Sequence, residues 1–579
     1  MRLRAALLVI AMLLSLFGAR LFQLQGIDSR AYAMRAQQSG MVSIELPAKR
    51  GRILDRNGVP FAESIAGLMI VADPTRTTPH AEAIAKIMAE RLHQDYFDLL
   101  AKLTKKGTRF VYVARRVPST LASSLMDELK KHEYAGVDTR SDPLRAYPAR
   151  DVAANLIGYI GDNPKDSSGG LERTFNNLLA GKDGSETYEV GGGNRIPLGD
   201  NTEVKPVDGK DLRLTIDRDV TWYAQRVLRT AVQQAKAESG AAVVMDSRTG
   251  EILALADYPT FDANKPGKAD KADLGSRALS DVYEPGSVEK VLTVSSLLHA
   301  DKVTPRTRFT VPSKLQVLDR IIGDWFPHNT IHLTMGGVIA RSSNIGTALA
   351  AMQFTPQELW SYLDRFGLGH RTDIGMPGET RGLLPSRATW NTLTRAQVAF
   401  GQGLGVNALQ MATAVNAIAN GGQLVTPSLV EGRATTSSGS EVGTDAAARR
   451  QVVKPSAARQ TAEMMELVTT QDVGTAPGAG IAGYRVAGKT GTAQEVGGKC
   501  NCYRDGGLAV SFAGFAPADK PRFTVYVVIK RPGKGASGGG TAGPVFRKIL
   551  SYVLQKYAVP PTGTTPVKIP TMWRAHTHG

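Results

Sequence analysis

The sequence predicts an α+β fold for the second half of the chain, on three observations. Two strand patterns occur near residue 250, and two more lie close to the C-terminus. The stretch between these pairs has mainly helical apolar spacing, and a further helical run follows the last strand. We therefore expect an interrupted sheet flanked by helices, with its first and last elements adjacent.

Length and composition indicate a globular protein with several domains. The chain has 579 residues, 42% hydrophobic and 21% charged, so two or three domains with a sizeable core are expected. The net charge of +17 favours binding to polyanions such as anionic lipids or acidic wall polymers. The alternative interpretation is that the charges only solvate a large surface. The positive residues are scattered and no recognisable nucleic-acid module occurs, which argues against nucleic acid as a partner.

The N-terminal segment predicts a membrane anchor. Residues 5–19 carry no charge, Arg2 and Arg4 precede them and Arg20 follows. A spanning helix needs about 20 residues, and Arg20 can snorkel to the head groups and extend the span to about Leu24. We predict a signal-anchor, a cytoplasmic N-terminus and an extracytoplasmic remainder.

A cleaved signal peptide is the alternative to this anchor. Its best cleavage point would follow Ala19, but Phe17 is large where a small residue is wanted. We therefore favour a single-pass protein of the cell membrane.

The region up to residue 210 predicts a domain of its own. Residues 78–135 have helical apolar spacing, and a Gly- and Asp-rich stretch over residues 181–209 punctuates the chain. Residues 211–217 alternate like a strand, and residues 218–237 follow as a helix-like run. The main domain boundary is expected near residues 210–235.

The second half supplies the elements of the α+β fold. Residues 241–246 and 251–256 predict a hairpin, residues 508–515 and 523–529 two late strands, and residues 544–557 a closing helix. Composition predicts a mobile loop at residues 433–446, and no core for the Pro/Thr-rich tail at residues 560–579.

The first chemical motif is Ser287-Val288-Glu289-Lys290. Turn formers precede it and an apolar helical run follows, so Ser287 is expected near a helix N-terminus with Lys290 on the same face. Serine needs an adjacent base, and a lysine serves when burial or a nearby cation such as Lys489 keeps it neutral. Taken alone, the motif is explained equally well by an exposed helix start.

The second motif is Ser342-Ser343-Asn344, in a polar break between two helical runs. Its functional interpretation is a loop that offers a hydroxyl relay from Ser342 and an amide from Asn344. Its structural alternative is a helix cap, since Ser and Asn are favoured caps.

The third motif is Lys489-Thr490-Gly491, in an expected edge strand. Lys489 and Thr490 offer a cation and a hydroxyl to a substrate carboxylate, and Gly491 lets a peptide approach the backbone. The backbone N–H groups of Thr492 and Ser287 can form an oxyanion hole. A surface turn after a strand is the alternative.

The joint occurrence of the three motifs decides between these alternatives. Their order, and their expected places on a helix start, an interhelical loop and a strand, indicate an active-site serine acyltransferase. Residues 401–405 are Gly-rich but follow no strand of a βαβ unit, so they do not predict a phosphate cradle.

No metal or cofactor is predicted. Cys500 and Cys502 are the only cysteines, which excludes a disulfide framework and leaves too few ligands for zinc. We expect them to be loop residues. His328 and His332 have no further metal-ligand residues at a suitable spacing, so we expect them to have a structural role or to lie at the rim of the site.

In these motifs the chain resembles the monofunctional, class B penicillin-binding proteins, the peptidoglycan D,D-transpeptidases. The strings YEPGSVEK, RSSNIGTA and VAGKTGTAQ are similar to the catalytic motifs of that family in their full context. Residues 50–58 look like the start of its non-catalytic pedestal, or dimerisation, domain, and residues 145–148 and 170–172 like its later motifs. Residues 366–369 and 375–379 resemble the division-type (FtsI-like) branch, which crosslinks the septal wall.

The resemblance implies a serine penicillin-recognising transpeptidase fold. This fold has a central antiparallel sheet flanked by helices, an all-helical subdomain, an elongated N-terminal pedestal and a single transmembrane helix. The implied division is an anchor at 1–24, a pedestal at 25–210, a linker and first helix at 211–234, a transpeptidase domain at 235–558 and a flexible tail at 559–579.

The resemblance also implies a two-step acyl transfer. Ser287 would attack the carbonyl between two terminal D-alanines of a stem peptide, and Lys290 would take its proton. Ser342, assisted by Lys489, would pass a proton to the departing D-alanine. An amine from a neighbouring stem would then form the crosslink, whereas β-lactams would acylate Ser287 and stay.

The remaining site residues would hold the substrate. These are Asn344, Thr490, Gly491 and Thr492. Residues 45–210 contain no glycosyltransferase motif, so polymerisation would come from a partner, a SEDS-family (FtsW-like) polymerase, among other divisome membrane proteins at the septum.

Four other functions stay open as alternatives to a division-type transpeptidase. An elongation-type transpeptidase, a D,D-carboxypeptidase and a β-lactamase share the acyl-enzyme, and a non-catalytic β-lactam sensor would need a cytoplasmic signalling domain.

Overall fold

The chain forms two compact units in the computed structural model, which describes residues 2–23, 41–161, 169–191, 194–195, 201–495, 503 and 507–574. Unit 1 contains Met1–Gly51, Ser64–Arg145 and Ala180–Lys210, and unit 2 contains Arg52–Glu63, Ala146–Leu179 and Asp211–Gly579. Each unit is therefore built from separated stretches of sequence. The predicted domain boundaries stay predictions, and Cys500 and Cys502 lie outside the described residues.

The N-terminal helix α1 spans Arg2–Phe22 and exposes apolar side chains such as Leu8, Phe17 and Phe22. Within the described part of the chain, we find no helix with both the length and the apolar character that crossing a bilayer demands. The signal-anchor stays a prediction.

A three-stranded antiparallel sheet carries the core of unit 1. Its central strand is β4 (Gly67–Ala72), which pairs with β5 (Val111–Pro118) and β6 (Val137–Ser141). The helices that share this core are α4 (Ala81–Leu92), α5 (Tyr96–Leu103) and α6 (Ser119–Lys131).

The prediction of helix throughout residues 78–135 is wrong at β5. Val111, Val113 and Val117 are buried, and exposed residues lie between them, so this segment alternates with the period of a strand. The β-branched side chains fit the pleated surface beside β4, which outweighs the helical spacing on either side.

A second sheet of unit 1 occupies much of the Gly-rich stretch. Strand β8 (Gly184–Gly191) pairs antiparallel with β1 (Met41–Leu46) and β10 (Thr202–Val204). The glycines lie at the ends of β8, and the Ser-Glu-Thr-Tyr-Glu-Val run between them has strand character.

The sheet of unit 2 confirms the predicted α+β layout. Its strand order is β13-β12-β24-β23-β22, and every neighbouring pair is antiparallel. The early hairpin therefore lies beside the late strands, through pairing of β12 with β24. The strands are β12 (Ser239–Asp246), β13 (Ile252–Tyr258), β22 (Ala487–Gln494), β23 (Leu508–Ala516) and β24 (Phe523–Lys530).

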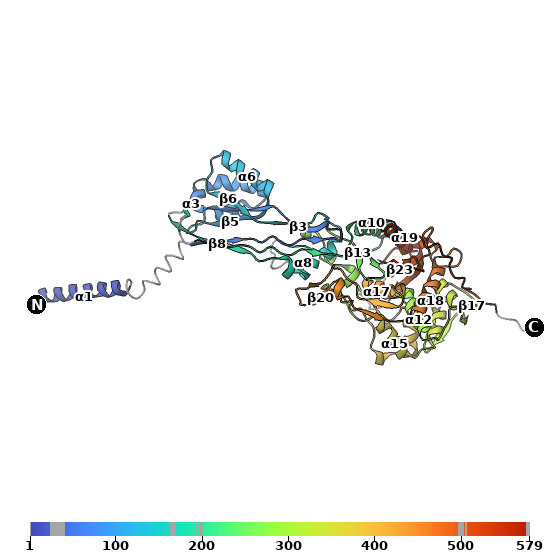
Figure 1. Ribbon diagram of the computed structural model, residues 1–579. Helices are drawn as coiled ribbons and strands as arrows, with labels where there is room; N and C mark the ends of the chain where they lie inside the picture. Colours follow the sequence, from blue (N-terminus) through green and yellow to red (C-terminus); the bar gives the residue numbers. More distant parts are fainter. Residues whose placement is uncertain are drawn as a thin grey trace, which may run out of the picture. The chain divides into compact units, whose positions relative to one another are not determined.

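Helices cover both faces of this sheet (Figure 1). One group consists of α10 (Arg218–Gln234) and α19 (Gly543–Lys556). The other group consists of α12 (Lys290–His299), α17 (Ala408–Ala419) and α18 (Pro455–Glu466). Because both faces are covered, β12 and β24 are buried almost throughout, which explains their continuous apolar runs.

A helical region adjoins α12, as the sequence predicts. Its helices are α13 (Met335–Arg341), α14 (Asn344–Ala351), α15 (Pro356–Arg365) and α16 (Thr392–Val398).

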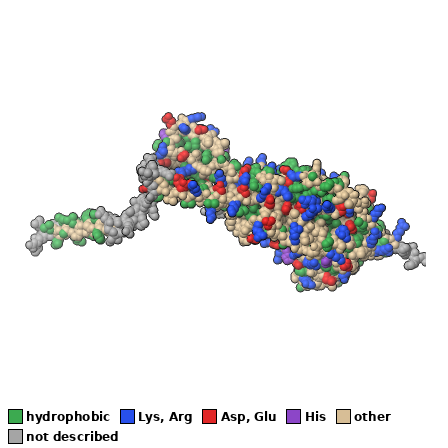
Figure 2. Space-filling view, viewed as in Figure 1, with side chains coloured by type: hydrophobic (Ala, Val, Ile, Leu, Met, Phe, Trp, Pro, Cys, Tyr) green, Lys and Arg blue, Asp and Glu red, His purple; other side chains and the backbone are tan. Residues whose placement is uncertain are grey.

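On the face of unit 2 seen in Figure 2, Lys and Arg side chains lie interspersed with Asp and Glu.

Candidate active site

The turn before α12 holds Ser287. A short 3₁₀ helix, Gly286–Val288, leads directly into α12, which begins at Lys290, so the expected helix start is confirmed. Gly286 has a φ of +54° and donates its N–H to the Gly401 carbonyl at 3.1 Å. A Cβ on Gly401 would lie 1.9 Å from the Gly286 oxygen. Position 401, the first of the Gly-rich residues 401–405, therefore has no room for a side chain beside the Ser287 turn.

Lys290 is fully buried and reaches the second motif. Its Nζ donates to the Ser342 carbonyl at 2.6 Å and to Asn344 Oδ1 at 2.7 Å, and lies 3.3 Å from Ser342 Oγ. Burial lowers the pKa of Lys290 to about 7, whereas the charges of Asp324 and Glu289 act in the opposite direction. The lysine is thus poised to exchange a proton near neutral pH.

The helix-cap interpretation of the Ser342-Ser343-Asn344 motif is confirmed for Ser343, whereas the hydroxyl relay from Ser342 stays a prediction. Ser343 is the N-cap of α14, and its Oγ accepts the Gly346 N–H at 2.8 Å. Ser342 ends α13 in the left-handed region, with a φ of +58°. This sharp reversal turns the Ser342 hydroxyl toward two lysines.

Lys489 of β22 is the second buried lysine. Its Nζ donates to Ser342 Oγ at 2.9 Å and to the Thr490 carbonyl at 3.0 Å. Burial, and then the proximity of Lys290, lower the pKa of Lys489 well below its usual value. These surroundings disfavour the charged form of Lys489 in the free protein, and its role as a substrate-binding cation stays a prediction. A bound carboxylate would raise its pKa again.

Strand β22 lies at the edge of the five-stranded sheet, which confirms the predicted edge strand. A Cβ on Gly491 would lie 2.2 Å from Ser511 Oγ and 2.9 Å from the Pro285 carbonyl. A Cβ on Gly286 would likewise lie 2.9 Å from the Thr492 carbonyl, so β22 and the Ser287 turn are in direct contact. Gly491 thus lets two parts of the site approach each other.

Asp324 is a site residue that sequence reasoning missed. Its side chain is fully buried and accepts hydrogen bonds from Ser343 Oγ at 2.6 Å and from the Ile345 N–H at 3.0 Å. His328 Nε2 lies 3.2 Å from Asp324 Oδ2, and the expected structural or rim role of this histidine stays a prediction. No motif spacing marks Asp324, because a single carboxylate in a polar loop is unremarkable until the fold buries it.

The three motifs meet around one hydroxyl group. Ser342 Oγ lies within hydrogen-bond distance of Lys290 Nζ and Lys489 Nζ, and Lys290 also holds Asn344. Ser287 lies one helical turn before Lys290, and Thr492 lies against Gly286. Such a site can activate a serine hydroxyl and move its proton through lysine and hydroxyl groups.

Comparison with known proteins identifies two domains. Residues 240–551 match the penicillin binding protein transpeptidase domain, and residues 45–214 match the penicillin-binding protein dimerisation domain.

Curated relatives match over nearly the whole chain. The penicillin-binding protein PbpB of Mycolicibacterium smegmatis is 33% identical over 96% of this chain and 90% of its own length. The peptidoglycan D,D-transpeptidase FtsI of Escherichia coli K12 is also 33% identical, over 90% of this chain and 86% of its own.

Solved structures match as broadly. A peptidoglycan synthetase from Bifidobacterium adolescentis is 30% identical with a TM-score of 0.73, over 92% of this chain and 100% of that one. Penicillin binding protein 3 of Mycobacterium tuberculosis, in complex with aztreonam, is 29% identical with a TM-score of 0.70 over the same shares. The chain belongs to the class B penicillin-binding proteins, which carry a dimerisation domain and a transpeptidase domain.

Proposed function

We propose that this protein is a peptidoglycan D,D-transpeptidase that crosslinks stem peptides through an acyl-enzyme on Ser287 and is acylated there by β-lactams. One observation carries the proposal: the buried nitrogens of Lys290 and Lys489 both donate hydrogen bonds to Ser342 Oγ. These contacts give the serine motif a base and a proton path in one place.

Acylation begins with proton transfer. Lys290, neutral above pH 7, takes the proton of Ser287 as its Oγ attacks the carbonyl between two terminal D-alanines. The N–H groups of Ser287 and Thr492 stabilise the oxyanion. Ser342 then passes a proton, with the help of Lys489, to the nitrogen of the departing D-alanine as the C–N bond breaks.

Crosslinking reverses the proton path. An amine of a neighbouring stem peptide attacks the Ser287 ester, an amide bond forms, the C–O bond breaks and Ser287 regains its proton. Asn344 orients the donor, and Thr490 and Gly491 bind it along the sheet edge. Before acylation, the carboxylate of the terminal D-alanine of the donor lies near Lys489 and favours the charged form of that lysine.

The cellular setting forms part of the proposal. The names of the relatives, among them FtsI and PbpB, support a role in septal wall synthesis. We place residues 1–24 in the membrane as a signal-anchor, 25–210 in the pedestal, 211–234 in a linker with the first helix, and 235–558 in the extracytoplasmic transpeptidase domain. A SEDS-family polymerase and other divisome membrane proteins are the proposed partners.

Labelling with a fluorescent penicillin tests the nucleophile. The full chain is expected to label covalently and Ser287→Ala to lose the label, whereas Ser295→Ala, a buried serine of α12, is the matched control that keeps it. Labelling that survives in Ser287→Ala would refute the assignment.

A stem peptide with and without an amine acceptor tests the reaction. A crosslinked product is expected, whereas hydrolysis alone would indicate a carboxypeptidase and rapid turnover of nitrocefin a β-lactamase. An acyl-enzyme that releases no peptide product would indicate a sensor. Absence of a fluorescent fusion from mid-cell would favour the elongation-type enzyme.

A further inference from the structure

The Pro/Thr-rich C-terminal segment is packed along unit 2, so the prediction that this tail has no core is wrong. We call residues 559–573 the strap. Near its start, Val559 accepts a hydrogen bond from Tyr484 at 2.5 Å, and Thr564 contacts Arg485 at 2.9 Å. Ile569 is only 8% exposed and belongs to the main apolar core.

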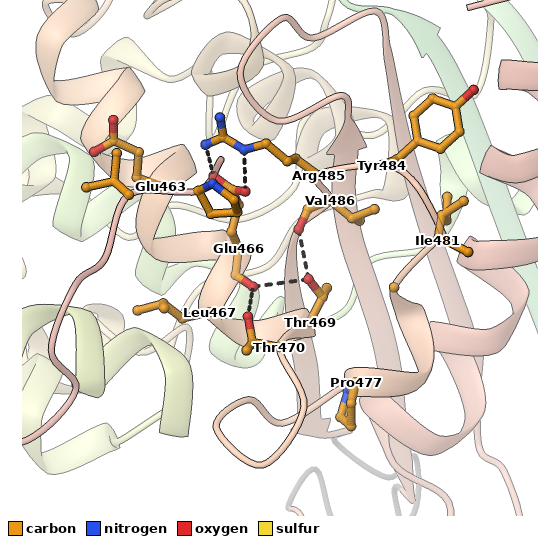
Figure 3. A pocket seen from close by; sticks show the side chains of 14 residues that line it. Glu463, Glu466, Leu467, Thr469, Thr470, Pro477, Ile481, Tyr484, Arg485 and Val486 are labelled. Atoms are coloured by element: carbon orange, nitrogen blue, oxygen red, sulfur yellow. Dashed lines mark hydrogen bonds and ion pairs between the residues drawn. The ribbon is translucent and has the colours of Figure 1, made fainter. Parts of the chain in front are cut away.

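The strap next passes a cavity of about 390 Å³ beside the residues that directly precede β22 (Figure 3). Pro566 and Val567 of the strap line this cavity, together with the ion pair of Glu466 and Arg485 and with Val486. The strap is thus one wall of the region from which β22 starts.

The far end of the strap lies against the elements that lead to Ser342. Strands β14 (Arg308–Val311) and β17 (Ile331–Thr334) pair antiparallel, and β17 runs directly into α13. Met572 forms an antiparallel bridge with Leu333, and the Trp573 ring is tilted by 52° against the His332 ring, with 4.4 Å between the ring centroids. The strap therefore pairs with β17 through this bridge and through the hydrogen bond from the Trp573 N–H to the His332 carbonyl at 3.3 Å.

The first turn of α13 is built around the strap backbone. The Thr334 N–H donates to the Thr571 carbonyl at 3.1 Å, and the Thr334 hydroxyl donates to the Pro570 carbonyl. Thr334 is the N-cap of α13, so the strap holds the residue at which the helix begins.

Two adjacent glycines of α13 show how closely the strap approaches this helix. A Cβ on Gly337 would lie 1.9 Å from the Thr571 oxygen, and one on Gly336 would lie 2.6 Å from Ile569 Cγ2. Glycine is unfavourable inside a helix, so two in succession require another reason. The strap supplies it, because any side chain at Gly337 would meet strap backbone.

We propose that the strap is a positioning element of the acylation site, which fixes the start of α13 and thereby places Ser342 between Lys290 and Lys489. Helix α13 has seven residues and ends at Arg341, so a displacement of its first turn is carried to Ser342 within two turns. At its other end, Arg341 Nη2 lies 3.9 Å from Met572 Sδ, which adds a strap contact beside Ser342. The proposal rests on the proposed function.

The test compares full chains that differ only in the strap. One variant stops after Ala558 and lacks the strap, and its control lacks only residues 575–579. A third variant is Gly337→Ala, which leaves the strap in the chain but displaces it. Each is reacted with fluorescent penicillin, and both the final labelled fraction and the acylation rate constant are measured.

The expected result separates positioning from folding. The variant without the strap and Gly337→Ala label to the same final fraction as the full chain but about tenfold or more slowly, since small misplacements of catalytic groups have large kinetic effects. The control lacking residues 575–579 reacts like the full chain. Gly337→Ala adds no further slowing once the strap is absent, because its Cβ then has nothing to displace.

Two outcomes would overturn the proposal. In one, both variants acylate at the full-chain rate. In the other, the labelled fraction falls while the labelled molecules react at the full-chain rate, so that the strap only stabilises the fold. Failure of the full chain to label would instead refute the proposed function.

Discussion

At the scale of single residues, the site depends on two desolvated amines that share one hydroxyl. Lys290 and Lys489 are both fully buried, and each places its Nζ within 3.3 Å of Ser342 Oγ. Two ammonium groups in such surroundings repel each other with little screening, so the neutral form is favoured. A neutral amine can accept the serine proton, which an ordinary surface lysine at pH 7 cannot do.

The rate of acylation is predicted to rise with pH through about 7, the pKa to which burial lowers Lys290. Below this pH the ammonium form cannot accept a proton, so the rate constant should fall about tenfold per pH unit. The groups that face Lys290 are Asp324, Lys489 and Glu289. Burial raises the pKa of Glu289 well above its usual range. Stopped-flow labelling from about pH 5.5 to 8.5 checks this, and a flat profile would contradict Lys290 as the base.

Asp324→Asn is predicted to shift this pH profile to lower pH. Loss of the buried negative charge lowers the pKa of Lys290 further, because Asp324 favours its charged form. The free energy of unfolding should also fall by roughly 1–3 kcal/mol, since the contacts with Ser343 and Ile345 weaken. Asp319→Asn is the matched control, because the Asp319 side chain is 75% exposed. An unshifted profile would show that Asp324 acts on stability alone.

At the scale of elements, the contact between β22 and the Ser287 turn matters most. Among the described strands of its sheet, β22 pairs with β23 alone, and an edge strand is where an extended peptide can add to a sheet. Its other constraint is the close approach of Gly491 to Ser511 and Pro285. The strand proposed to bind the substrate is therefore also the strand that packs against the turn of the proposed nucleophile, Ser287.

Gly491→Ala is predicted to slow acylation and to destabilise the protein by roughly 1–3 kcal/mol, because overpacking must separate β22 from its neighbours. Thermal unfolding and penicillin labelling measure the two effects. The control is Gly478→Ala, where a Cβ would meet nothing within 4 Å. Equal behaviour of the two variants would show that the site tolerates a wider spacing.

At the scale of the whole molecule, the two units are interleaved in sequence. Unit 2 takes in Ala146–Leu179, whose buried residues Leu156, Leu171 and Phe175 belong to its main core. Asn155 Nδ2 from the same segment donates to the Asp273 carbonyl at 2.6 Å. A single cut near residue 210 therefore does not follow the packing.

A chain that starts at residue 211 is predicted to unfold at a lower temperature than one that starts at residue 41. It lacks the core side chains of Ala146–Leu179, and each buried Leu or Phe contributes about 2–5 kcal/mol. Differential scanning calorimetry of the unit 2 transition provides the comparison. Equal transition temperatures would show that this segment adds little to the stability of unit 2.

The sequence predicted most of the elements around the site but not their exact packing. Turn formers before Ser287, the polar break at Ser342 and the glycines around Lys489 are local signals, and each marks an element that the structure contains. Residues 111–118 were misassigned because helical spacing on both sides concealed a strand pattern that pairs with β4. Only long-range pairing distinguishes such a strand from its surroundings.

By itself, the sequence determined the order of the catalytic motifs and the α+β layout, since both follow from short-range chemistry and apolar period. Tertiary structure alone decided which lysines are buried together, which carboxylate contacts the Ser342 loop and which segment packs against the start of α13. The physical reason is that desolvation and close packing depend on atoms brought together from distant positions. Lys290, Asp324, Lys489 and Thr571 illustrate this, because what each does at the site depends on contacts with residues remote from it in the chain.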